Sequence, residues 1–227
     1  MHVAPHRHRA CRMIIEEKAS TGTASGKREI ASTRPTADAP VPPGRCESVT
    51  PIEPPEPRNL RRCRPWQSLP DSAKFGNALD RVAYHEAGHV VVMQWLGLAS
   101  PGASIDATEP VVRGSAEWPD RSLWQDCPDP PPDESGVLAA TAASVYHAGL
   151  MAELVHAGVR WVGPIHYPHT TDYQRADEML RSAFGSHASG AHAFAQRMAL
   201  HVLSGRWQRV REVADCLVRD GAWRPPG

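Results

Sequence analysis

The sequence has no excess charge of either sign, because 25 Lys and Arg residues balance 25 Asp and Glu residues. Without a basic surplus, nothing in the overall charge favours nucleic acid or an anionic membrane as a partner. Cysteine is also scarce: the five cysteines are odd in number, and none is spaced as Cys-x-x-Cys. This usage argues against a disulfide framework and a cysteine metal site, and it is typical of a reducing, cytoplasmic location.

Long hydrophobic runs are nearly absent. No apolar segment follows the first charged residues, so a secretory signal is not expected. The most apolar run, residues 137–155, approaches the ~20 residues that a membrane-spanning helix needs. It contains His147 and Glu153, and both are costly to place in lipid. We therefore expect a buried helix of a soluble protein and no membrane span.

The first third of the chain has few residues that could form a core. Half of the 22 prolines lie within the first 70 residues, and aromatic residues are almost absent before Trp66. Such a segment buries too little apolar surface to offset the entropy of ordering it. We predict a disordered, Pro/Arg-rich tail over residues 1–75 and a folded domain over residues 76–222.

From residue 77 onward, apolar residues recur at helical spacing and predict a mainly α-helical domain. Helices are expected at about 78–97, 133–158 and 172–184, followed by two that end at Gly205 and Gly221. Two short β-like pieces, 104–107 and 111–114, predict a small sheet edge.

Capping residues mark the expected starts of two helices. Asp133 is a good N-cap for the helix that begins near it. Thr171 and Gln174 have the spacing of a capping box, which fixes the start of the next helix.

The segment His85-Glu86-Ala87-Gly88-His89 has the spacing His-Glu-x-x-His. Residues four apart stand above one another on a helix, so both imidazoles reach the same point. Glu86 is rotated about 100° away and can act on a water beside the metal rather than ligate. This arrangement predicts a zinc (Zn2+) site with Glu86 as general base.

The alternative is that His85 and His89 are ordinary histidines of a core helix. Both lie within the apolar stripe, where unpaired imidazoles would be costly to bury. Gly88 is a poor helix residue, and its presence is explained if another backbone approaches closely there. Both observations favour the metal site.

A third ligand must come from another part of the chain. Asp172 is our choice, because it falls in the first turn of a helix, where the helix dipole favours the ionised carboxylate. Acidic residues are common in first turns for that same reason, so helical position alone leaves the choice open. Glu153 is the rival, as a ligand, as a partner that orients a ligating histidine, or as an exposed helix residue. His166 and His169 are further candidates.

Three segments resemble the FtsH-type zinc metallopeptidase domain, peptidase family M41. Residues 83–90 (AYHEAGHV) are similar to its zinc helix, residues 148–155 (AGLMAELV) to its Gly-x-x-Ala-Glu-Glu segment, and residues 171–176 (TDYQRA) to its Asn-Asp-x-x-x-Ala segment. The resemblance covers roughly residues 78–185. It implies a helical zinc-peptidase fold with His85, His89 and Asp172 as ligands and Glu86 as general base.

The sequence also departs from that family. Its ATPase module and membrane anchors are absent, one acid (Glu153) stands where two are usual, and residues 103–114 lack the usual Pro-Arg-Gly run. We therefore expect an ATP-independent metalloendopeptidase that acts on peptides or unfolded proteins. A second oxyanion donor is expected among Tyr167, His166 and His169.

The sequence is also consistent with two other functions. One is a non-catalytic, zinc-containing pseudopeptidase or adaptor, and the other is a peptidase subunit that works with a separate ATPase. Self-association into a homo-oligomer is a further alternative.

Overall fold

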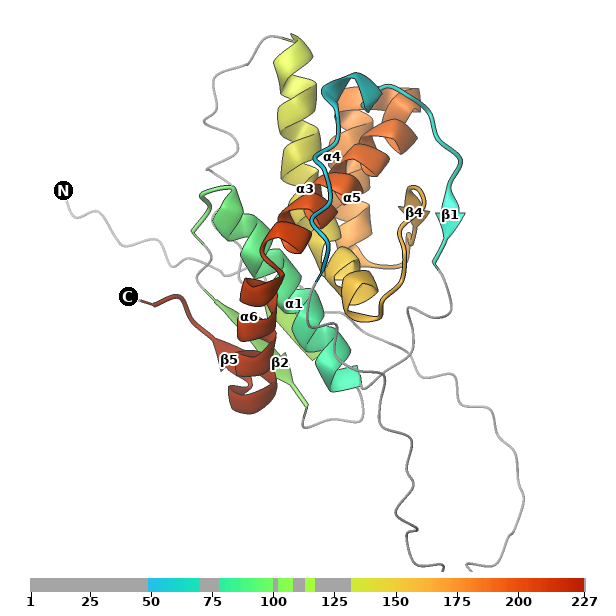
Figure 1. Cartoon of the computed structure of the whole chain (residues 1–227). Coiled ribbons are helices and arrows are strands. Elements are labelled where there is room, and N and C mark those ends of the chain that lie inside the picture. The colour runs from blue at the N-terminus through green and yellow to red at the C-terminus, as the bar shows by residue number, and fades with distance from the viewer. Residues whose placement is uncertain (1–48, 70–77, 100–101, 108–112, 117–131, 227) are drawn as a thin grey trace, which may run out of the picture.

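The computed structural model describes residues 49–69, 78–99, 102–107, 113–116 and 132–226, and they form a mostly helical unit (Figure 1). The α-helices are α1 (Ala78–Trp95), α3 (Pro132–His156), α4 (Thr171–Phe184), α5 (Ala188–Gly205) and α6 (Trp207–Asp220). The strands are β1 (Gln67–Ser68), β2 (Ala103–Asp106), β3 (Arg113–Ala116), β4 (Ile165–His166) and β5 (Ala222–Trp223), and the short 3-10 helices are η1 (Pro57–Asn59) and η3 (Gly185–His187). The expected mainly α-helical class with a small β component is confirmed.

Helix α1 is the centre of the fold and is buried on all sides from Val82 to Met93. The sequence predicted an apolar stripe, but α3 covers one face of α1 while α6, β2 and β3 cover others. A helix enclosed in this way needs small residues at its crossings. A Cβ at Gly88 would lie 2.5 Å from the carbonyl oxygen of Ala148 on α3. The predicted close backbone approach at Gly88 is thus confirmed.

Helix α3 is the most apolar helix of the described chain. By length and composition its segment Gly136–His156 could cross a bilayer, but 67% of that window is buried inside the protein. It packs against α1 on one side and against α4 and α5 on another, as Figure 1 shows. The core helix of a globular domain has the same properties, which agrees with the expectation of a buried helix.

The small sheet has the order β3-β2-β5, with both pairings antiparallel. The strands β2 and β3 lie within one or two residues of the predicted pieces. The sequence did not predict β5, which follows α6 directly after Gly221. That glycine adopts the left-handed conformation (φ 71°) that ends a helix, and it turns the chain back onto β2.

The prediction that residues 1–75 form a disordered tail is wrong for residues 49–69. This segment, which we call the strap, lies along α5 and ends in β1, which pairs in parallel with β4. The backbone N–H of Ile52 donates to Ser204 Oγ (2.9 Å), its carbonyl accepts from His201 (2.6 Å), and Leu60 is buried. Backbone hydrogen bonds and a few apolar anchors thus order a Pro-rich segment. Residues 1–48 and 70–77 lie outside the described part of the chain.

Two predicted helix caps differ from those in the structure. The N-cap of α4 is Thr170, whose hydroxyl accepts from the backbone N–H of Tyr173, and Gln174 donates to the carbonyl of Pro168. The predicted pair of Thr171 and Gln174 is therefore wrong by one residue, because two adjacent threonines offer the same hydroxyl. Helix α3 begins at Pro132, so Asp133 lies inside its first turn.

Replacing Gly190 by Ala should destabilise the protein. A Cβ at Gly190 would lie 2.6 Å from the carbonyl oxygens of Leu60 and Arg62, so the strap would be pushed off α5. We expect a net loss of roughly 1–2 kcal/mol in the free energy of unfolding, since overpacking costs about 1–3 kcal/mol and Ala gains up to about 1 kcal/mol in a helix. Urea titration measures this.

Gly205→Ala is the matched control, because a Cβ there meets no atom within 4 Å at the exposed end of the same helix. Equal stability of the two variants would show that the strap does not pack on α5 in solution.

Candidate metal centre

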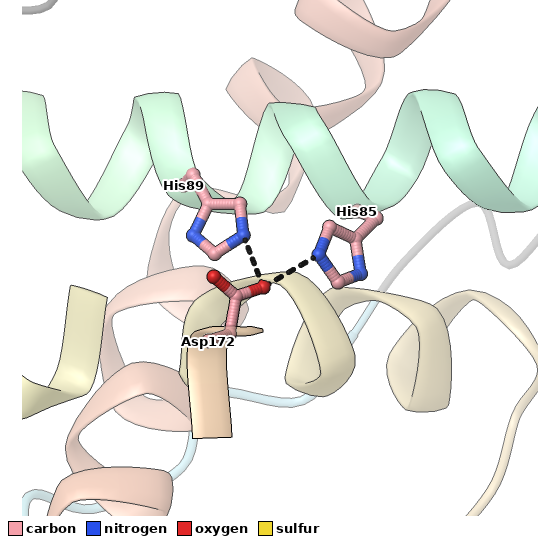
Figure 2. Close-up of side chains that lie close together, drawn as sticks. All are labelled: His85, His89 and Asp172. Atoms are coloured by element: carbon pink, nitrogen blue, oxygen red, sulfur yellow. Dashed lines mark hydrogen bonds and ion pairs between the residues drawn. The ribbon is translucent and has the colours of Figure 1, made fainter. Parts of the chain in front are cut away.

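Helix α1 presents His85 and His89 one turn apart, with ring centroids separated by 4.8 Å. Figure 2 shows both imidazoles extending from α1 toward the carboxylate of Asp172. Asp172 lies in the first turn of α4 and is 1% exposed. Its Oδ2 atom is 3.1 Å from His85 Nε2 and 3.3 Å from His89 Nε2. The three residues chosen from the sequence are therefore together.

The outer nitrogen of each ring is held by a hydrogen-bond acceptor. His85 Nδ1 lies 2.5 Å from the carboxylate of Glu153, and His89 Nδ1 lies 2.7 Å from the carbonyl oxygen of Val145, both on α3. A carbonyl and a carboxylate accept, so each Nδ1 carries the proton. In a neutral ring this leaves the lone pair on Nε2, the atom that faces Asp172.

This arrangement brings three acceptor atoms to one point. Two imidazole lone pairs and a carboxylate oxygen repel one another unless a cation lies among them. Ligands about 2.0–2.1 Å from a tetrahedral ion stand about 3.4 Å apart, close to the separations seen here. The other carboxylate oxygen of Asp172, Oδ1, is buried without a hydrogen-bond partner among the described residues. The donor set fits a metal ion.

The electrostatics of the cluster favour positive charge. Burial disfavours the charged form of His85, yet hydrogen bonds to Asp172 and Glu153 outweigh it and raise the pKa of His85 well above its usual value. Burial likewise opposes ionisation of Asp172, but the charges of His89 and His85 and their hydrogen bonds lower the pKa of Asp172 well below its ordinary range. The site therefore attracts a proton where no metal is present, and a metal ion would compete with that proton.

Glu153, whose role the sequence left open, forms a hydrogen bond with the His85 ring. Its Oε1 accepts from His85 Nδ1, and its Oε2 lies 3.5 Å from Arg81 Nε. Carboxylates commonly fix a ligating histidine in this way, setting its tautomer and ring orientation.

Gly149 is a site residue whose role the sequence did not reveal. A Cβ at this position would overlap the His85 ring, and all three of its nearest atoms belong to that imidazole. Helix α3 therefore passes over His85 only because residue 149 has no side chain. The signal was a glycine within an otherwise Ala-rich helix, one turn before Glu153.

Glu86 is 1% exposed and lies on the side of α1 that faces β3. A Cβ at Gly114 on β3 would lie 2.6 Å from Glu86 Oε1, so this glycine makes room for the carboxyl group. Burial raises the pKa of Glu86 to about 7, against the lowering effect of His85 and His89. A group that titrates near neutrality is suited to accept and return a proton.

The loop residues proposed as oxyanion donors do not join the cluster. Tyr167 is buried, and its hydroxyl lies 2.6 Å from His147 Nδ1. His166 is exposed, and its ring lies 5.2 Å from that of Trp66 in a tilted contact and 5.1 Å from that of Tyr173 in an edge-to-face contact. His169 is also exposed.

No protein-family model matches the chain, and no curated protein matches its sequence significantly. The resemblance to FtsH-type peptidases therefore rests on the three short segments alone.

Replacing Glu153 by Ala should weaken metal binding about 10–100-fold, as is typical when a partner that orients a ligating histidine is lost. Isothermal titration with zinc into metal-free protein measures the change. Glu178→Ala is the matched control, because this acid is exposed on α4. An unchanged affinity in Glu153→Ala would mean that the hydrogen bond to His85 does not support the centre.

Proposed function

We propose that this protein is a zinc-dependent metalloendopeptidase that hydrolyses peptide bonds in peptides or unfolded protein segments. One observation supports this most directly: a buried group of two histidines and an aspartate, compatible with a metal ion, lies beside a second buried carboxyl group. Two imidazoles and one carboxylate form a ligand set typical of catalytic zinc, which keeps a fourth position open. The resemblance of three segments to FtsH-type peptidases supports the same proposal.

In this proposal His85, His89 and Asp172 hold the ion, and Glu153 and Val145 keep the two rings in the ligating tautomer. Zinc, when bound, supplies Lewis-acid activation of water and of the scissile carbonyl group. Glu86 accepts a proton from the attacking water and delivers it to the leaving amine nitrogen as the peptide bond breaks. The desolvation that raises the pKa of Glu86 to about 7 matches that double role.

The surroundings of Glu86 support the proposed substrate class. Within the described chain, β3 pairs with β2 on one side and stands next to Glu86 at Gly114. An extended peptide could add to the other edge of β3 through main-chain hydrogen bonds. Peptides and unfolded segments adopt that form readily, so we propose them as substrates in preference to folded proteins.

A structural zinc module without catalysis is the second candidate. The observation that favours it is burial: His85 is 6% exposed, His89 is 0% exposed and Asp172 is 1% exposed. The two candidates differ in what Glu86 does, because a structural site needs the three ligands alone.

Purified protein should contain about one zinc ion per chain, held by His85, His89 and Asp172. Asp172→Ala removes a ligand and should leave the protein largely metal-free, as should His85→Ala. Metal analysis after dialysis measures this, with Glu178→Ala as the surface control. Retention of zinc by both ligand variants would disprove the centre.

Glu86→Gln should abolish cleavage of denatured casein or of a peptide library while zinc stays bound. Gln has nearly the same shape but cannot accept the proton from water. Glu178→Gln makes the same change on the surface of α4 and should cleave like the wild type. Zinc loss in Glu86→Gln would instead give Glu86 a structural role. A zinc-loaded wild type without cleavage would favour the structural module.

A further inference from the structure

A second buried polar cluster joins α3, α4 and α5, and it contains none of the residues His85, His89 and Asp172. Tyr167 precedes α4, His147 is on α3, His192 is on α5, and Asp177 is on α4 itself. The Tyr167 hydroxyl lies 2.6 Å from His147 Nδ1, His147 Nε2 lies 3.0 Å from His192 Nδ1, and His192 Nε2 lies 3.1 Å from Asp177 Oδ1. Both imidazoles are completely buried.

The donor and the acceptor of each of these three hydrogen bonds can be assigned. A carboxylate accepts, so His192 Nε2 donates to Asp177, and in the neutral ring His192 Nδ1 accepts from His147 Nε2. His147 Nδ1 must then accept a hydrogen bond from the Tyr167 hydroxyl. Burial keeps both rings neutral, because it lowers the pKa of His192 to about 4 and that of His147 well below its usual value. The hydroxyl proton of Tyr167 is thus directed to His147, not to the metal centre.

The hydrogen-bonded residues flank Asp172 on both sides along the sequence. The carbonyl oxygen of Tyr167 lies 3.4 Å from both the backbone nitrogen and the hydroxyl of Thr170. Thr170 caps α4 through the N–H of Tyr173, the residue after Asp172. Asp177, further along the same helix, binds His192. The residues before the first turn of α4 are therefore bonded to α3 through Tyr167 and His147, and the residues after it to α5 through Asp177 and His192.

The loop that precedes α4 is held in place without these hydrogen bonds. Gln196 on α5 already binds both backbone groups of Ile165, each at 2.9 Å. Burying two further imidazoles costs free energy unless each is fully paired, and apolar residues would fill the space more cheaply. A polar network that is fully paired fixes one geometry more strictly than apolar packing does.

We propose that Tyr167, His147, His192 and Asp177 form a positioning relay that holds the carboxylate of Asp172 at the metal centre. None of the four residues belongs to the cluster of His85, His89 and Asp172. They act by fixing the position and angle of the first turn of α4. The proposal rests on the metal centre of the proposed function but not on peptidase activity.

Tyr167→Phe tests the relay, because it removes a single hydroxyl group. We expect zinc affinity to fall about tenfold, the lower end of what is lost when a supporting hydrogen bond of a metal site is removed. We also expect the visible spectrum of the cobalt(II)-substituted protein to change, because that spectrum reports coordination geometry. A role in stability alone would leave the spectrum as in the wild type.

Tyr173→Phe is the matched control. It makes the same chemical change next to Asp172, but the Tyr173 hydroxyl is buried with no hydrogen-bond partner among the described residues. Its zinc affinity and cobalt spectrum should equal those of the wild type. An equal loss in both variants would mean that general packing, not the relay, sets the position of Asp172.

Asp177→Asn provides a second test at the partly exposed end of the relay, should Tyr167→Phe fail to fold. It should change the cobalt spectrum in the same direction and by less, while Arg181→Gln, which removes only the ion pair to Asp177, should not. Wild-type spectra in both Tyr167→Phe and Asp177→Asn would overturn the relay and leave the proposed function standing. A wild type that binds neither metal would overturn both.

Discussion

One electrostatic constraint governs the site: the fold brings three acceptor atoms to one buried point, where they repel one another unless a positive charge lies among them. Hydrogen bonds at the outer nitrogens of His85 and His89 turn the lone pairs of both rings toward Asp172. A folded chain tolerates such an arrangement only with positive charge at its centre. The raised pKa of His85 and the lowered pKa of Asp172 express the same requirement.

The same constraint explains the packing of α1 and α3. The two helices must come close enough for α3 to reach the outer nitrogens of both histidines, and glycines make this contact possible. Gly88 admits the backbone of α3 at Ala148, and Gly149 admits the His85 ring. Larger residues at either position would separate the helices and remove the acceptors that set the ring tautomers.

Local spacing predicted the parts of the site that lie on one element, and long-range contacts decided the rest. His85, His89 and Glu86 follow from the helical period alone. Asp172 was chosen from its place in the first turn of a helix, and the resemblance supported that choice. The role of Glu153 stayed open because it depends on how α3 crosses α1. The carbonyl of Val145 leaves no trace in a sequence. The strap was missed because its composition indicates disorder, while its backbone hydrogen bonds to α5 cannot be inferred from composition.

Burial at the centre fits both a structural and a catalytic metal ion, and Glu86 distinguishes them. A structural ion is satisfied by its ligands, and an adjacent buried carboxyl group then only adds a desolvation cost. Here Gly114 on β3 leaves space for that carboxyl group, and Glu86 Oε2 is buried without a hydrogen-bond partner among the described residues. A side chain held in this way is unfavourable for stability and suited to proton transfer, and for this reason we favour the catalytic assignment.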